Sequence, residues 1–191
     1  MADTYYMEDT ERGRKVLILC GSGPEGSTAE MCRASADSLS EAGFTPIVVM
    51  PIGMGISHCT GCQNCSADAE CVIEDRMSEL YGLFRECDGV VMATPLRFSG
   101  PSSVIKAVMD RMQIYWNHPE VPRPGWIVMS ACSGSDSPDF SHLRSIMRAF
   151  SITLGMEWAG EIYVTGTDGG RDHVYGQVRS SFEYIISSGK V

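Results

Sequence analysis

The 191-residue sequence lacks several features that define broad classes of protein. It has no apolar run long enough to cross a bilayer, and its first residues are polar and acidic, without the apolar core of a secretory signal. Acidic side chains outnumber basic ones by 24 to 15, so the formal charge of −9 argues against nucleic acid or an anionic membrane as partner. Internal repeats are also missing. We expect a cytoplasmic protein with a flexible tail over residues 1–14 and a single domain over residues 15–191.

Cysteine, in contrast, is abundant, and half of the eight cysteines stand in one short segment. Residues 59–71 read C-T-G-C-Q-N-C-S-A-D-A-E-C, with thiols at Cys59, Cys62, Cys65 and Cys71. Four sulfurs at this spacing fold around one centre, as thiolates do when they hold zinc or an iron–sulfur cluster. Structural zinc sites usually have a longer spacer between two ligand pairs, so the compact C-x2-C-x2-C run favours a 4Fe-4S cluster. Redox-labile thiols or strained disulfides are the alternatives.

A second motif follows the first apolar run of the chain. Residues 15–20 (K-V-L-I-L-C) are typical of a strand buried on both faces, and G-S-G-P-E-G-S-T follows at 21–28. A helix should begin near Ser27, with Glu30 completing a capping box. A strand, a Gly/Ser loop and a helix N-terminus together form an anion site, and without the P-loop lysine we expect it to take one phosphate monoester. A plain β–α turn is the alternative, since Glu25 lies in the loop.

Four further apolar runs alternate with amphipathic helical patterns. The expected strands cover 45–51, 89–93, 125–130 and 157–165. This alternation predicts an α/β doubly wound parallel sheet of five strands, with the cysteine-rich loop 52–74 inserted after the second strand. Ligands of such sheets bind beyond the carboxyl ends of the strands, so loops 21–28, 94–101 and 130–136 should converge there. In the flavodoxin-like strand order 2-1-3-4-5, FMN occupies that position.

Residues 15–111 resemble the iron–sulfur flavoproteins within the flavodoxin-like NADPH-dependent FMN reductase superfamily. The loop at 21–28 is similar to the phosphate loop G-S-P-R-x-x-G-N-T, and the cysteines match C-x2-C-x2-C-x4–7-C. T-P-L-R-F-S-G-P-S-S-V-I-K-A-V-M-D-R at 94–111 resembles the S-P-V-Y-F…K-x-x-x-D-R segment that wraps the flavin ring. The resemblance implies bound FMN, a 4Fe-4S cluster, NAD(P)H as a substrate, and a homo-oligomer (dimer or tetramer) in which one subunit's cluster approaches a neighbour's flavin.

The resemblance also implies which residues bind each group. The FMN phosphate would be held by Ser22, Gly23, Ser27 and Thr28. The ring edge would be contacted by Pro95, Leu96, Arg97 and Phe98, with a third contact from Ser133 and Gly134. The cluster ligands would be Cys59, Cys62, Cys65 and Cys71.

Two departures from the family pattern affect the flavin site. The arginine of the phosphate loop is missing, which leaves the helix dipole and hydroxyl groups to bind the phosphate. Arg97 stands where the family has an aromatic residue. Beside the flavin N1 it would stabilise the anionic reduced ring; the alternative is a solvated surface arginine.

We therefore expect a flavin-dependent oxidoreductase that passes electrons between a 4Fe-4S cluster or NAD(P)H and an acceptor, with a small molecule or a protein as redox partner. No catalytic side chain is assigned, because the flavin carries the chemistry. The rival functions are a cluster-free NAD(P)H-dependent FMN or quinone reductase, a non-catalytic electron carrier and a zinc-stabilised module. The other cysteines (Cys20, Cys32, Cys87 and Cys132) are expected to be buried hydrophobes, Cys132 having an alternative redox role. Y-W-N-H-P at 115–119 would cover the flavin, pack a subunit interface or form a surface loop.

Overall fold

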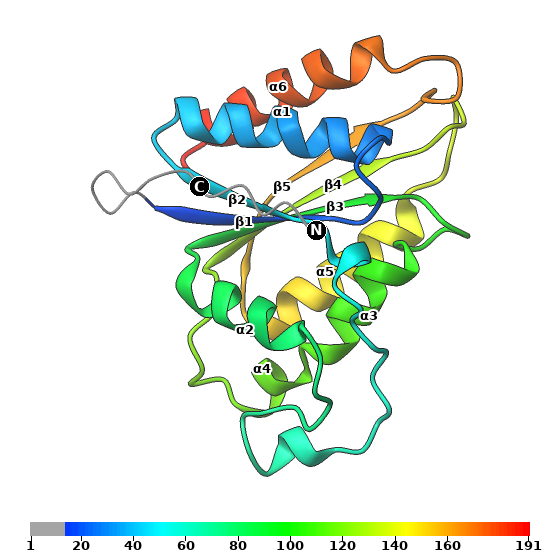
Figure 1. Ribbon diagram of the computed structural model, residues 1–191. Coiled ribbons are helices and arrows are strands. Elements are labelled where there is room, and N and C mark those ends of the chain that lie inside the picture. Colours follow the sequence, from blue (N-terminus) through cyan, green and yellow to red (C-terminus); the bar gives the residue numbers. More distant parts are fainter. Residues whose placement is uncertain (1–13) are drawn as a thin grey trace.

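The computed structural model describes residues 14–191, so the expected N-terminal tail lies outside the described part except for Arg14. Five parallel strands form one sheet in the order β2-β1-β3-β4-β5 (Figure 1). The strands are β1 (Lys15–Cys20), β2 (Thr45–Val49), β3 (Gly89–Pro95), β4 (Trp126–Cys132) and β5 (Glu157–Val164). The predicted doubly wound sheet and its strand order are both confirmed.

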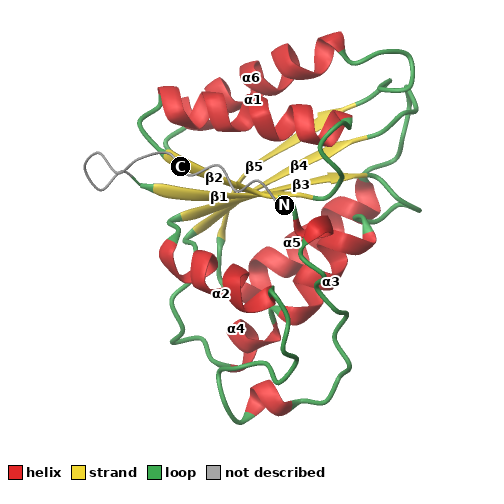
Figure 2. Ribbon diagram, viewed as in Figure 1, coloured by secondary structure: helices red, strands yellow, loops and turns green. Residues whose placement is uncertain are grey.

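Helices cover the two faces of the sheet as separate layers (Figure 2). One face is covered by α1 (Ser27–Glu41) and α6 (Asp172–Ser187). The other is covered by α2 (Met77–Glu86), α3 (Ser103–Arg111) and α5 (Ser141–Leu154), with the short helix α4 (Gln113–Asn117) beneath them. Part of the Y-W-N-H-P segment is therefore helical, which the sequence pattern did not indicate. Two 3-10 turns, η1 (Pro51–Gly53) and η2 (Asn64–Ser66), lie in the connection from β2 to α2.

The pattern of burial follows from the strand order. The inner strands β1, β3 and β4 are almost wholly buried, because they have a strand on each side and a helical layer on each face. Strand β2 comes from an apolar run that predicts a buried strand, but it is only half-buried along its whole length. It is an edge strand with β1 as its single neighbour, and it ends at Val49 because Pro51 opens a 3-10 turn.

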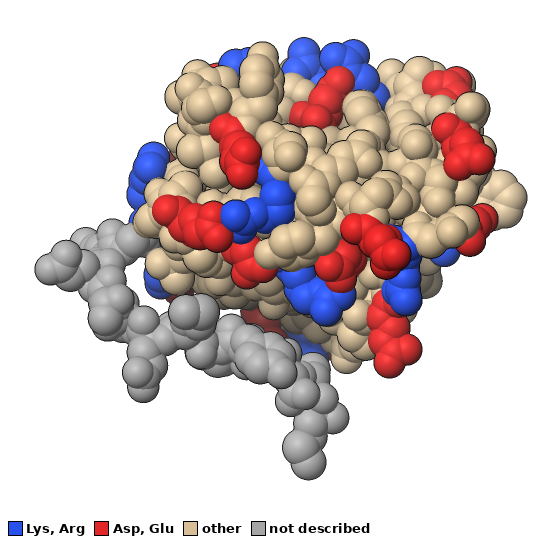
Figure 3. Space-filling view, turned by 90° about the horizontal axis from the view of Figure 1, so that it is seen from above, with Lys and Arg blue, Asp and Glu red and all other residues tan. Residues whose placement is uncertain are grey.

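The chain connections place two regions at different ends of the molecule. The strands end at one edge of the sheet, where the loops after β1, β3, β4 and β5 gather (right in Figure 1). The cysteine-rich loop 52–74 leaves the end of β2 and runs away from that edge, beneath the helices (cyan to green in Figure 1). On the face of α1 and α6, basic and acidic side chains are interspersed (Figure 3), and Arg33–Glu30 and Arg179–Glu41 form ion pairs. Among residues 14–191, no helix is long and apolar enough to cross a membrane.

Candidate cofactor sites

The loop after β1 presents backbone N–H groups without protein acceptors. Helix α1 begins at Ser27, but its N-cap is Gly26 and no side chain caps it, so the expected capping box with Glu30 is wrong. Within residues 14–191, six N–H groups of the loop donate no hydrogen bond: those of Ser22, Gly23, Glu25, Gly26, Ser27 and Thr28. These donors and the positive end of the helix dipole lie together, which is the arrangement that binds a phosphate group. The loop therefore fits the phosphate of FMN.

The side chains of this loop contribute less than the N–H groups. The Ser22 hydroxyl is half-buried and donates to the Gly23 carbonyl over 3.0 Å. Thr28 is only 2% exposed, and its hydroxyl lies 3.3 Å from the sulfur of Cys132. Its hydroxyl therefore points into the protein, and a bound phosphate would meet the backbone of Thr28 instead.

Gly21 fastens the loop to the next strand. Its N–H donates to the Ala93 carbonyl over 2.7 Å. A Cβ at this position would lie 2.7 Å from Ile105 Cγ1, 2.8 Å from Ser102 Oγ and 2.9 Å from the Ala93 oxygen, all too close for any side chain. This close approach joins the phosphate loop to the segment predicted to line the flavin ring.

The strand order also decides between two kinds of nucleotide site. Residues 21–26 (G-S-G-P-E-G) satisfy the letters G-x-G-x-x-G, so the sequence alone does not separate this loop from a dinucleotide fingerprint. Dinucleotide folds of the Rossmann type have the order 3-2-1-4-5-6, whereas this sheet has the order 2-1-3-4-5 of flavodoxins. The topology favours a mononucleotide.

The segment after β3 forms a tight turn at the edge of the sheet. Arg97 and Gly100 exchange two backbone hydrogen bonds, of 2.9 and 2.8 Å, around Phe98 and Ser99. Both central residues have positive φ, +48° and +64°, which costs a non-glycine residue roughly 1 kcal/mol or more. The Phe98 side chain is fully exposed. Backbone strain that presents an aromatic ring to solvent is typical of a binding site.

The backbone of this turn narrows the predicted contacts to the flavin ring. Pro95 has no N–H, the N–H of Leu96 donates to Cys132, and the N–H of Arg97 donates to Gly100. Within residues 14–191, the N–H of Phe98 has no acceptor, so it is the amide among the four predicted residues that is available to a ring atom. The Arg97 side chain is exposed, and its charge lies near enough to act on Cys132, whose pKa is nevertheless raised because the thiol is buried.

The third loop is joined to the connection after β5. Ser133 donates its N–H to Val164 and accepts from Thr167, and Asp168 donates its N–H to Gly134. A Cβ on Gly134 would lie 2.2 Å from the Asp168 carboxylate, so packing between two loops is enough to explain this glycine. The predicted contact of Ser133 and Gly134 with the flavin gains no separate support from this geometry.

A cation reaches the phosphate loop from a distant part of the chain. Arg171, the N-cap residue of α6, donates a guanidinium hydrogen bond to the Glu25 carbonyl. The two residues are 146 positions apart, which is why no local motif indicated the contact. Arg171 thus supplies positive charge beside a loop that lacks the arginine of the family motif.

The four cysteines of the predicted cluster site line one pocket. It measures about 330 Å³ including the space open to solvent, and it is bordered by Cys59, Cys62, Cys65, Cys71 and the C-terminal end of α3. Among residues 14–191, no three His, Cys, Asp or Glu side chains are close enough to hold a single metal ion. Zinc needs thiolate sulfurs at about 2.3 Å from one point. Four thiols that line one pocket are the donor set of either zinc or an iron–sulfur cluster.

Hydrogen-bond donors surround the sulfurs. The Gly61 N–H donates to Cys59 over 3.4 Å, and the Asn117 amide donates to Cys65 over 3.6 Å. His118 lies 3.1 Å from the Cys65 carbonyl oxygen. Hydrogen bonds to sulfur stabilise the thiolates that iron–sulfur clusters require. The residues around α4 therefore contact the cysteine segment, a contact that the sequence pattern did not indicate.

An ion pair outside the motif holds the ends of the cysteine segment. Arg111 and Asp75 are 2.9 Å apart, with side chains 1% and 9% exposed. Arg111 also donates to the carbonyl groups of Ser57 and Ile73, over 3.1 and 3.3 Å. Asp75 accepts from the N–H of Ser57 over 2.8 Å. Burial raises the pKa of Asp75, but the hydrogen bonds from Arg111 and from the N–H groups of Ser57 and Met77 together hold it below the ordinary value. The sequence pattern indicates neither role.

The remaining cysteines are free and buried, as expected for small hydrophobes: Cys20, Cys32, Cys87 and Cys132. Three of them gather beneath the phosphate loop, where the Cys20 sulfur lies 3.6 Å from the Ser22 carbonyl oxygen and Cys132 contacts Thr28. Burial keeps Cys132 a thiol, which gives no support to a redox role.

Comparison with known proteins identifies the family. The family model of NADPH-dependent FMN reductases matches residues 14–168. Two iron–sulfur flavoproteins of Archaeoglobus fulgidus are 31% identical over 141 residues, covering 73% of this chain and 64% of the relative, and 39% identical over 96 residues, covering 50% and 49%. The chain thus spans between half and two thirds of the length of these relatives.

Solved structures agree on the fold. The NAD(P)H:quinone oxidoreductase of Methanothermobacter marburgensis superimposes with a TM-score of 0.70 at 18% identity, covering 91% of this chain and 95% of that one. At this identity the likeness concerns the fold alone. The sequence resemblance is carried by the family match, and this chain belongs to the NADPH-dependent FMN reductase family, where curated relatives carry the name iron–sulfur flavoprotein.

Proposed function

We propose that the protein is a flavin-dependent oxidoreductase that binds FMN at the carboxyl edge of the sheet and a 4Fe-4S cluster on Cys59, Cys62, Cys65 and Cys71. The observation that carries the proposal is the presence of two prepared sites in one chain: a row of free N–H groups at a helix N-terminus, and a pocket lined by four thiols. FMN accepts electrons singly or in pairs, whereas a cluster passes them one at a time.

The chain's own residues have distinct tasks in this proposal. The N–H groups of the phosphate loop anchor the cofactor, and the strained turn at Phe98 places one free N–H beside the ring. Beneath them Ala93 and Ile105 are fully buried, so this apolar layer keeps water away from the side of the site that faces the protein core. Donor and acceptor are a nicotinamide nucleotide or a one-electron carrier on one side and a small molecule or protein on the other.

The length of α3 bears on how the two sites communicate. The flavin turn precedes the N-terminus of α3, while the cysteine pocket includes Asp110 and Arg111 at its C-terminus. Nine helical residues span about 13 Å, so the two groups do not touch within one chain. The resemblance to iron–sulfur flavoproteins, and not this separation, is the ground for a homo-oligomer in which the cluster of one subunit lies near the flavin of another.

The test is purification without oxygen, followed by a visible spectrum and assays of iron, sulfide, zinc and FMN. We expect about four irons and one FMN per chain, with a broad shoulder that dithionite bleaches. Cys59→Ala should lose iron and keep FMN. Cys87→Ala is the matched control, because Cys87 is buried at the end of α2 and should leave iron unchanged.

Other outcomes would support the rival functions. FMN without iron, even after reconstitution, would indicate a cluster-free NAD(P)H-dependent FMN or quinone reductase. Both cofactors without turnover of NAD(P)H and an acceptor would indicate an electron carrier. Stoichiometric zinc without flavin would indicate a zinc-stabilised module.

A further inference from the structure

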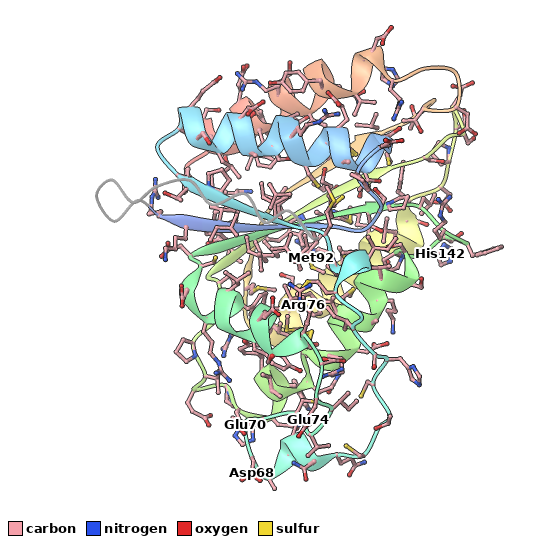
Figure 4. The ribbon with its side chains drawn as sticks, in the orientation of Figure 1. Asp68, Glu70, Glu74, Arg76, Met92 and His142 are labelled. Atoms are coloured by element: carbon pink, nitrogen blue, oxygen red, sulfur yellow. The ribbon has the colours of Figure 1, made fainter. Side chains whose placement is uncertain are left out.

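Arg111 is the basic residue in the lining of the cysteine pocket. The loop 52–74 contains no lysine or arginine, and Asp68, Glu70 and Glu74 lie along it (Figure 4). Four thiolates would add further negative charge. The compensating cation therefore comes from α3, outside the motif, and it is buried.

The guanidinium of Arg111 has one donor without a partner. Its two terminal nitrogens are occupied by Asp75, Ser57 and Ile73, on both sides of the cysteine motif. Its Nε is buried and has no hydrogen-bond partner among the residues that the structure describes. An unpaired buried donor costs about 1–3 kcal/mol, so its retention points to an acceptor supplied by a bound group.

The backbone at this position is fixed as well. Tyr81, which is 8% exposed, donates its hydroxyl to the Arg111 carbonyl over 2.7 Å. Arg111 is thus held at two points: Tyr81 binds its backbone carbonyl, and Asp75 binds its guanidinium. A donor held in this way keeps its direction whether or not the pocket is filled.

We propose that Arg111 is a positioning residue for the cluster: it holds the two ends of the cysteine segment together before the cluster binds, and its free Nε–H donates to a sulfur of the bound cluster. Only the donation from Nε to the cluster rests on the proposed function. Donation to sulfur stabilises the more negative, reduced form of the cluster and so makes reduction easier. The clamp acts on the protein alone.

Three variants separate the two parts of the proposal. Arg111→Lys keeps the charge but loses Nε and the planar fork that reaches three partners. Asp75→Asn loosens the clamp and keeps Nε. Arg179→Lys is the matched control, because Arg179 pairs with Glu41 on the opposite face of the sheet.

The first measurement uses iron-free protein and limited proteolysis. We expect Arg111→Lys and Asp75→Asn to be cut within residues 57–75 about tenfold faster than wild type, with Arg179→Lys unchanged. Equal rates in all four proteins would overturn the clamp. If Arg111→Lys fails to fold, Asp75→Asn alone decides this arm.

The second measurement uses loaded protein, with iron release to a chelator and a reductive titration followed by electron paramagnetic resonance. Changes in the groups around metal ligands typically alter affinity at least tenfold, so Arg111→Lys should release iron about tenfold faster. Its equilibrium constant for reduction should fall about tenfold, the effect of one charge-assisted hydrogen bond. Asp75→Asn should release iron faster without becoming harder to reduce.

The outcomes distinguish this proposal from the proposed function. If the wild type takes up no iron, the cluster assignment fails, while proteolysis still tests the clamp. If the wild type carries a full cluster and Arg111→Lys is as easily reduced, donation by Nε is wrong.

Discussion

The two proposed cofactor regions of this protein are held in place in different ways. The loops at the flavin edge leave buried strands and are joined to one another by backbone hydrogen bonds, such as Gly21 to Ala93 and Leu96 to Cys132. The cysteine segment has only 3-10 turns, and most of its residues are exposed. Its ends are held by the side chains of Arg111 and Asp75. The flavin edge thus depends on topology, whereas the cysteine pocket depends on a few side chains outside its motif.

The largest effect is expected where the flavin edge is most tightly packed. Gly21→Ala places a methyl group against Ile105, Ser102 and the Ala93 oxygen, and should lower the free energy of unfolding by about 3 kcal/mol, the upper range for overpacking. FMN affinity should fall as well. Urea unfolding of the cofactor-free protein measures the first effect, and quenching of flavin fluorescence the second.

Gly23→Ala is the control for this change. It lies two residues further along the same loop, and a Cβ there meets nothing within 4 Å. Its unfolding free energy should match that of wild type. If both variants were equally destabilised, loss of glycine flexibility and not packing would explain the result.

A smaller effect is expected from the side chains that hold the cysteine segment. Asp75→Asn removes the charge that Arg111 and the Ser57 N–H contact, and should lower the free energy of unfolding of iron-free protein by about 2 kcal/mol at pH 7. The measurement is urea unfolding at several pH values.

The pH dependence gives a second check on the same pair. The pKa of Asp75 is lowered in the folded protein, so its stabilisation is present above the ordinary aspartate pKa of about 4 and is lost as the pH falls through the lower, folded value. The difference between wild type and Asp75→Asn should therefore persist down to about pH 4 and vanish below it. A difference that persisted in stronger acid would mean that the carboxylate charge is not involved.

A single neutral hydrogen bond should have a smaller effect again. Asn117→Leu keeps the size of the side chain and removes the donor to Cys65. In loaded protein the cluster should become harder to reduce by about 1 kcal/mol, a factor of about five in the equilibrium constant. Gln113→Leu, in the lining of the same pocket, is the control. An unchanged midpoint potential in Asn117→Leu would remove this amide from the account.

The sequence predicted the sheet that carries the flavin edge. For the cysteine segment it indicated the four cysteines but not the side chains that hold them. The bounds of β1 were predicted to the residue, because an apolar run between Arg14 and Gly21 leaves little freedom. The spacing of the four cysteines was enough to propose them as ligands. Their supports were not, since Arg111 and Asp75 are 36 positions apart and Asn117 and Cys65 are 52 apart, and no local pattern reports such pairs.

One signal for the missed support was present. Arg111 follows Val108 by three residues on the apolar face of α3 and directly precedes the buried Met112, so a cation stands among apolar residues at the end of this helix. A buried charge requires a partner of opposite sign. The acidic residues after the last cysteine, Glu74 and Asp75, are candidates for that partner.

The smallest effect is expected from Arg171, whose side chain contacts the phosphate loop from a distant part of the chain. In this one respect the flavin edge resembles the cysteine segment, which is also held by distant side chains. Arg171→Gln should weaken FMN binding about two- to threefold, because an exposed charge near a phosphate contributes well under 1 kcal/mol. The difference should shrink as salt is added, since salt screens exposed charges.

Arg33→Gln is the control: Arg33 lies on α1 in an ion pair with Glu30 and donates nothing to the loop. Titrations of cofactor-free protein with FMN at low and high salt measure both variants. Equal affinities for Arg171→Gln and wild type at low salt would mean that the phosphate loop binds through backbone groups alone, and the flavin edge would then owe nothing to side chains outside it.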